Sequence, residues 1–128
     1  MNALSFVAIG SGAACGAWLR WALSTLINAV YPPMPLGTLV ANLAGSFLMG
    51  MALVLLIERG AFPQELRYAI TTGFLASFTT MSTFSAETMS LITRAEWVIA
   101  ALHVILHVGG SVLMIFIGMY AARAVAGS

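Results

Sequence analysis

The sequence predicts an all-α integral membrane protein made of one four-span domain over residues 1–128, and three observations lead to this prediction. Hydrophobic residues make up 61% of the chain and charged residues only 7%, whereas a soluble domain is roughly 25% charged. A membrane-spanning helix needs about 20 apolar residues, so four spans with short connections take up almost the whole chain. The apolar stretches are separated by proline, glycine and charged residues, which commonly end helices.

The four expected spans follow one another with short connections. Their approximate bounds are residues 4–29, 36–57, 66–93 and 97–122. The proline-rich segment 31–35 closes the first span, because repeated proline cannot continue a helix. The second span ends at Glu58, and the third and fourth are separated by Arg94 and Glu96.

The N-terminal segment and the placement of the arginines predict an uncleaved inner-membrane protein. The N-terminus lacks the basic region of a cleaved signal peptide, so the first span is expected to remain. Arg59, Arg67 and Arg123 fall on one side of the predicted topology, and Arg20 and Arg94 fall toward the other. Arginine and lysine excess normally sets orientation, so this weak bias favours insertion both ways and head-to-tail pairing. A net charge of +1 gives nucleic-acid binding no electrostatic basis.

Polar residues recur every four positions inside three of the spans, and residues four apart share a helix face. The three stripes are Arg20, Ser24 and Asn28; Thr38, Asn42 and Ser46; and His103, His107 and Ser111. A four-helix bundle fills its own centre with side chains, so a polar route is expected at a subunit interface. The small pairs Gly12/Gly16 and Ala41/Gly45 pack helices either between subunits or within one.

The third span carries a cluster of hydroxyl side chains at its middle. Its members are Ser77, Thr79, Thr80, Ser82, Thr83 and Ser85. Irregular backbone at membrane depth is tolerated where protein or water surrounds it, so we expect a break between about Ala76 and Ser82. The alternative is a regular helix whose hydroxyls bond back to its own carbonyls.

These polar groups favour a small anion as the ligand. Hydroxyls, the Asn42 amide and arginine donate hydrogen bonds, and the ring of Phe84 has a positive edge. Arg20 is either a fixed charge at the mouth of an anion route or an interfacial topology anchor. Glu87 is the acid within a span, with roles as helix cap, vestibule group or proton relay left open. His103 and His107 have a metal-ligand spacing, although hydrogen bonding across helices explains them as well.

Four sequence segments resemble the Fluc (CrcB) family of bacterial fluoride channels. They are GAWLRW at 16–21, GTLVANL at 37–43, TTGF at 71–74 and STFSAE at 82–87. The resemblance covers the whole chain in length, span count and motif order. It implies an antiparallel, dual-topology homodimer whose third helices are broken at mid-membrane, with two pores that export fluoride passively through the lipid membrane.

The resemblance also implies roles for individual residues. The anion pathway would comprise Arg20, Asn42, Met81, Ser82, Thr83, Phe84, Glu87, His107 and Ser111. The backbone carbonyls of Ala76 and Thr79 would hold a structural sodium ion at the dimer centre. Two departures stand out: Met81 replaces the second phenylalanine of the family, and Ala76-Ser77 replaces a Gly-Gly pair. Methionine keeps bulk but offers no positive ring edge.

The sequence therefore predicts a fluoride-selective ion channel that lowers fluoride toxicity, and no enzyme. Two alternatives remain at this stage. A proton-coupled small multidrug exporter would need Glu87 as its working acid, although such exporters carry that glutamate in the first span. A paralogue subunit that conducts only with a partner would fit the departures at Met81 and Ala76-Ser77.

Overall fold

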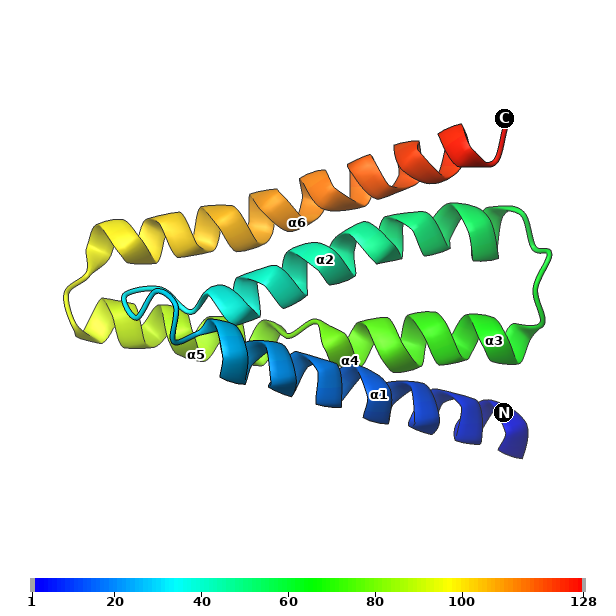
Figure 1. The fold of residues 1–128 in the computed structure, drawn as a ribbon, viewed down its shortest axis with the longest axis horizontal. Helices are drawn as coiled ribbons and strands as arrows, with labels where there is room; N and C mark the ends of the chain where they lie inside the picture. Colours follow the sequence, from blue (N-terminus) through cyan, green and yellow to red (C-terminus); the bar gives the residue numbers. More distant parts are fainter. Residues whose placement is uncertain (1, 128) are drawn as a thin grey trace.

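The computed structural model describes residues 2–127, and these form helices with short connections (Figure 1). The elements in chain order are α1 (Ala3–Ile27), α2 (Leu36–Ala52), the π-helix η1 (Leu53–Glu58), α3 (Gln64–Tyr68), the π-helix η2 (Ala69–Leu75), α4 (Ala76–Phe78), α5 (Met81–Thr93) and α6 (Trp97–Val125). The chain thus passes back and forth four times, and both termini lie at the same end of the molecule (Figure 1).

Three helical segments in the described part of the chain are long and apolar enough to cross a membrane. They are Ala3–Ile27, Leu36–Glu58 and Trp97–Val125. Their bounds agree with the expected spans to within three residues. The expected span at 66–93 has no such continuous helix, because it consists of α3, η2 and α4 on one side and α5 on the other.

The passage from α4 to α5 contains an interruption of two residues. Thr79 (φ −84°, ψ 159°) and Thr80 (φ −153°, ψ 120°) are both extended, so the helical hydrogen-bond pattern stops there and starts again at Met81. The Thr80 side chain accepts a hydrogen bond from the backbone N–H of Thr83 at 3.2 Å. It is the N-cap of α5, a position that favours threonine because the first N–H groups of a helix have no partner within the helix.

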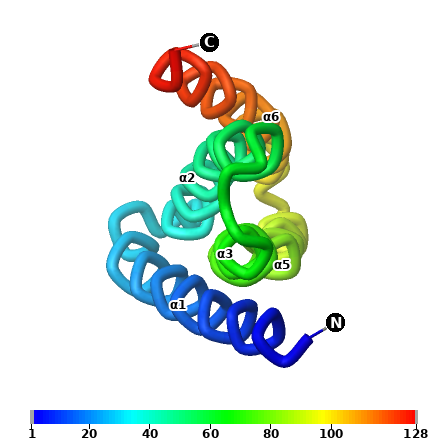
Figure 2. The backbone as a smooth tube through the Cα atoms, turned by 90° about the vertical axis from the view of Figure 1, so that its right-hand side faces the viewer, coloured from blue at the N-terminus to red at the C-terminus, as the bar shows by residue number. Residues whose placement is uncertain are grey.

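The helices pack in two close pairs, α2 against α6 and α1 against η2 (Figure 2). A side chain on Gly118 of α6 would collide with the backbone carbonyl of Phe47 in α2, and one on Gly12 would collide with that of Ala69. Glycine therefore lets these backbones touch, as is common between helices in membranes. For Gly12 and Gly16, the contacts lie within one subunit, with η2 and α4.

Large apolar side chains remain exposed along the outer faces of α1 and α6. They include Phe6, Trp18, Trp21, Leu26, Trp97, Ile105, Val112, Phe116 and Tyr120. The contiguous apolar exposure on both helices is far above what a soluble monomer shows. These faces fit contact with lipid or with another apolar protein surface.

Candidate functional site

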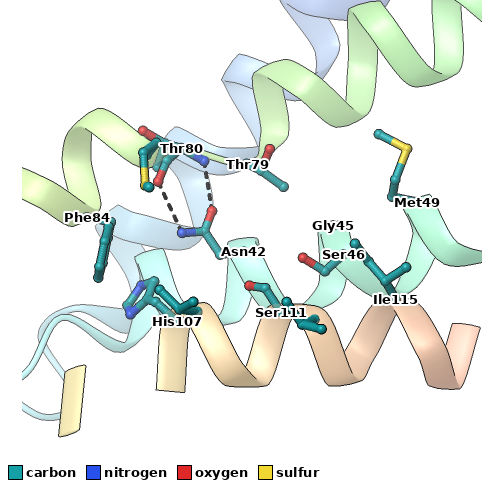
Figure 3. Close-up of a pocket in the computed structure, with 13 residues that line it drawn as sticks. Asn42, Gly45, Ser46, Met49, Thr79, Thr80, Phe84, His107, Ser111 and Ile115 are labelled. Carbon is teal, nitrogen blue, oxygen red and sulfur yellow. Dashed lines mark hydrogen bonds between the residues drawn. The ribbon is translucent and has the colours of Figure 1, made fainter. Parts of the chain in front are cut away.

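An open groove of about 410 Å³ runs beside the interruption, between α2, α5 and α6 (Figure 3). Its walls are formed by Asn42, Gly45, Ser46, Met49, Thr79, Thr80, Met81, Phe84, His107, Val108, Ser111, Val112 and Ile115. None of these described lining residues is an acid, a lysine or an arginine. The groove therefore combines apolar walls with a few amide, hydroxyl and imidazole groups.

Asn42 connects α2 to the interruption through two hydrogen bonds (Figure 3). Its Nδ2 donates to the carbonyl of Thr80 at 3.1 Å, and its Oδ1 accepts from the Thr80 N–H at 2.7 Å. Where the backbone leaves a helix, its N–H and carbonyl groups lose their helical hydrogen-bond partners. Here the Asn42 amide supplies a partner for both the N–H and the carbonyl of Thr80. An amide nitrogen has two N–H donors, so one donor of Asn42 remains at the edge of the groove.

The ring of Phe84 lies against both imidazoles of α6. Its centroid is 5.3 Å from that of His103, with the rings stacked, and 4.7 Å from that of His107, with the rings tilted. Phe84 and His107 are both buried and both line the groove. The aromatic contact thus fixes α5 against α6 next to the lining.

Glu87 lies one helical turn beyond Phe84 and faces α2 and α6. The hydroxyl of Thr38 donates to its Oε1 at 2.6 Å, and its Oε2 lies 3.5 Å from Nε2 of His103. The capping role considered for Glu87 is wrong, because Thr80 caps α5. Glu87 does not line the groove and is instead enclosed by partners on two neighbouring helices.

The remaining predicted residues lie around the groove in different ways. Ser111 lines it, and so does Met81, whose side chain is 71% exposed. Ser82 and Thr83 do not line the groove, and Ser82 is exposed. The Thr80 hydroxyl donates to Oγ1 of Thr83 at 3.1 Å and lies 3.4 Å from Oγ of Ser82.

Arg20 is half-buried outside the groove. Its Nε donates to the carbonyl of Ser77 at 3.0 Å, at the end of α4 that precedes the interruption. The third residue of the stripe on α1 also has a structural use, because Asn28 Oδ1 accepts from the N–H of Gly37 in the first turn of α2 at 2.7 Å. The stripe on α1 therefore attaches that helix to α2 and α4.

The carbonyls of Ala76 and Thr79 flank the end of α4. The hydrogen bonds found among residues 2–127 include none that reaches either carbonyl oxygen. Helices end with carbonyls that lack a partner within the helix, and here the following residue turns its N–H to Asn42 instead. These two oxygens are thus free to accept a further ligand.

The predicted anion pathway did not include four residues that the structure brings to the site: Thr38, Ser46, Thr80 and His103. Three of them belong to the polar stripes, so the stripes themselves carried the signal. Thr80 had a different signal, because a threonine three positions before Thr83 at a suspected break is a typical N-cap arrangement. The pairing of Glu87 with Thr38 and His103 had no local signal in the sequence, since Thr38 lies 49 positions and His103 16 positions away from Glu87.

Comparison with known proteins adds independent information. Residues 7–119 match the family model described as CrcB-like protein, Camphor Resistance (CrcB). A protein of Aromatoleum aromaticum called fluoride-specific ion channel FluC is 51% identical over 121 residues, which is 94% of this chain and 92% of that protein. Proteins of the same name from Ralstonia pickettii (46% identical; 96% and 98% covered) and Thiobacillus denitrificans (43%; 93% and 96%) are also similar.

Proposed function

The chain belongs to the CrcB-like family, and from this premise we propose that it is a fluoride-specific ion channel through which fluoride leaves the cytoplasm passively. Relatives that are similar over nearly the full length of this chain carry that name. The observation in the chain itself that supports the function best is the groove, in which hydrogen-bond donors stand in apolar walls without a carboxylate (Figure 3).

The proposed mechanism is the replacement of water by protein donors. A small anion gives up part of its hydration shell when it enters a narrow apolar passage, and the cost falls when N–H and O–H groups take the place of water. In this chain those groups are the free donor of Asn42 and the hydroxyls of Ser46 and Ser111. No bond is made or broken, so no catalytic residue is needed.

The other predicted residues support this passage in separate ways. Arg20 supplies positive charge near the interruption, which raises the local concentration of anions. Ser82 and Thr83 hold the Thr80 cap in place, and Phe84 with His107 shapes one wall. Met81 occupies the exposed rim, where a second copy would contact it. Glu87 sets the position of α5 through Thr38.

A second, antiparallel copy would complete the passage. The groove is open on one side of the single chain, and the apolar faces of α1 and α6 are exposed. The weak arginine bias between the two ends fits insertion in both orientations. A dimer with a twofold axis through the interruption then contains two equivalent routes, one along each groove, with the interrupted segments at mid-membrane.

A structural sodium ion fits the backbone carbonyl oxygens at the interruption. Backbone carbonyls are hard oxygen ligands of the kind that alkali and alkaline-earth cations prefer, and those of Ala76 and Thr79 are free among residues 2–127. Two copies would contribute two carbonyls each. Bound there, sodium would supply positive charge that holds the ends of the two α4 segments together. Carbonyl ligation needs no particular side chain, so Ala76-Ser77 is compatible with it.

The membrane potential gives the direction of transport in the inner membrane. One elementary charge gains about 2.3 kcal/mol per 100 mV, so an interior-negative potential drives the anion outward without coupling to another ion.

An efflux assay tests this function directly. Vesicles that contain the purified chain and potassium fluoride are diluted into fluoride-free buffer, and valinomycin is added to balance the charge while an electrode records fluoride. The expected result is release that starts with valinomycin and scales with the amount of protein. Release no faster than that from protein-free vesicles would refute the function.

A further inference from the structure

Glu87, His103 and His107 form a cluster of potential metal ligands at the wall of the groove that His107 lines. One ligand atom from each residue lies within 4.8 Å of the other two. Glu87 comes from α5, and both histidines come from α6, where a spacing of four residues places them on one face. The centroids of the two imidazoles are 4.2 Å apart.

These three residues bury polar atoms that have no hydrogen-bond partner. His103 is 0% exposed and His107 is 4% exposed. Among residues 2–127, the buried side-chain atoms without a hydrogen-bond partner are Oε2 of Glu87, both ring nitrogens of His103 and Nε2 of His107. Two of these atoms, Oε2 of Glu87 and Nε2 of His103, lie 3.5 Å apart without forming a hydrogen bond. An unsatisfied buried polar group costs about 1–3 kcal/mol, so several of them in one place indicate a missing ligand.

The other atoms of the cluster are held as metal-binding side chains usually are. Nδ1 of His107 lies 2.9 Å from the carbonyl oxygen of His103. Because a carbonyl oxygen only accepts, Nδ1 carries the proton and Nε2 keeps a free lone pair. Thr38 binds the other oxygen of Glu87 at 2.6 Å. Metal ligands are typically oriented by such outer hydrogen bonds to a carbonyl or hydroxyl group.

We propose that Glu87, His103 and His107 bind a divalent transition-metal ion of the zinc class. Two neutral imidazoles and one carboxylate form a donor set for Zn²⁺, with a fourth position left open. Imidazole nitrogen disfavours Na⁺, Mg²⁺ and Ca²⁺, which separates this site from the carbonyls of Ala76 and Thr79. Metal–ligand bonds of about 2.0–2.2 Å put tetrahedral ligand atoms about 3.5 Å apart, so small side-chain movements close the site.

Occupation of this site has a consequence for transport that rests on the proposed function. His107 and Phe84 line the groove, and Phe84 packs on both imidazoles. A bound dication immobilises this wall and, at its open position, retains a hard anion such as fluoride. The metal therefore inhibits efflux.

Cobalt(II) serves as the spectroscopic probe for the site. Full-length protein, purified in detergent without a histidine tag, is titrated with Co²⁺, whose visible d–d absorption becomes intense in tetrahedral coordination. The expected result is an intense band that saturates at one ion per chain and disappears when Zn²⁺ is added. No intense band in the wild-type protein would overturn the proposal.

Matched variants locate the ion. The variants His107→Gln and Glu87→Gln should weaken Co²⁺ binding at least about tenfold. Glu58→Gln removes an exposed carboxylate at the far end of η1 and should bind as the wild type does. Equal binding by all three variants would overturn the assignment.

A second measurement uses the wild-type protein, so its outcome does not depend on whether the variants fold. X-ray absorption of zinc-loaded wild-type protein should show two imidazole nitrogens and a carboxylate oxygen around the metal, and a shell of oxygen alone would refute the site.

In vesicles, Zn²⁺ should slow wild-type fluoride release about tenfold, with recovery after EDTA, and unchanged release would refute inhibition. If vesicles release no fluoride at all, the channel function fails, whereas the cobalt spectrum still decides whether the metal site exists.

Discussion

At the scale of single residues, Asn42 combines two tasks in one side chain. Its amide completes the backbone hydrogen bonds of Thr80, and it places a donor on the groove. A hydrophobic residue of the same size would leave a backbone N–H and a carbonyl unpaired next to apolar walls. The residue that shapes the interruption is therefore also part of the lining.

The substitution Asn42→Asp tests both tasks. Aspartate keeps the volume and an oxygen acceptor, but it loses the donor to Thr80 and adds a negative charge to a groove without one. We expect fluoride efflux to fall to the rate of protein-free vesicles, because the carboxylate repels the anion and removes its donor. Asn2→Asp is the control, since aspartate caps α1 as well as asparagine does. Wild-type efflux from Asn42→Asp would contradict the role of the amide.

At the scale of elements, the interruption between α4 and α5 is stabilised from three sides. Asn42 binds Thr80 from α2, Arg20 binds the Ser77 carbonyl from α1, and the Thr80 hydroxyl caps α5. Irregular backbone is costly in an apolar environment unless each polar group finds a partner. Two neighbouring helices and the hydroxyl of Thr80 within the interruption supply these partners, so the interruption is a defined structure.

Loss of the cap should measurably destabilise the protein. Thr80→Ala removes the acceptor for the N–H of Thr83, and we expect the free energy of unfolding in detergent to fall by about 1 kcal/mol. Thr88→Ala is the matched control, because that hydroxyl only bonds back to the carbonyl of Phe84 within the same helix. Equal stability losses in the two variants would contradict a specific capping role.

Close contact between α2 and α6 should depend on glycine. Gly118→Ala would place a methyl group against the carbonyl of Phe47, and relief by helix movement should cost about 1–3 kcal/mol. Gly109 lies on the same helix, and a methyl group added there would meet no atom within 4 Å, so Gly109→Ala should cause no loss of stability. Thermal unfolding in detergent compares the two. A Gly118→Ala protein as stable as Gly109→Ala would contradict the close packing.

Hydropathy and proline placement predicted the helices well, because spans are set by length and local composition. The third passage was harder, since the choice between a regular helix and an interrupted one depends on whether neighbouring helices supply Asn42 and Arg20 as partners. The polar stripes singled out Asn42, Ser46, His107 and Ser111, all of which line the groove, whereas the roles of His107 and Ser111 in an anion pathway came from the family resemblance. They did not identify Glu87 as a partner of Thr38, because contacts between helices depend on rotation about each axis.

At the scale of the whole molecule, both termini lie at one end (Figure 1). The groove is open on one side of the single chain. Ion pairs join Glu58 to Arg123 at 3.1 Å at one end and Glu96 to Arg94 at 3.4 Å at the other. The number of arginines rather than the net charge sets orientation, and the two ends differ by only a few arginines, so insertion in both orientations is the proposal to be tested.

Insertion in both orientations can be measured by cysteine labelling in intact cells. In a Cys15→Ala background, Ala61→Cys marks one end of the molecule and Pro33→Cys marks the other. A membrane-impermeant maleimide should label about half of the chains at either position, because the weak charge bias gives no preferred orientation. Complete labelling at one position and none at the other would contradict an antiparallel pair.

The central claim is that donors in an apolar groove select fluoride, and a comparison of halides tests it most directly. Vesicles that contain the purified protein are loaded with equal concentrations of fluoride and chloride, and ion-selective electrodes follow both anions after valinomycin is added. We expect fluoride release with chloride held inside at the level of protein-free vesicles. Release of both anions at equal rates would contradict it.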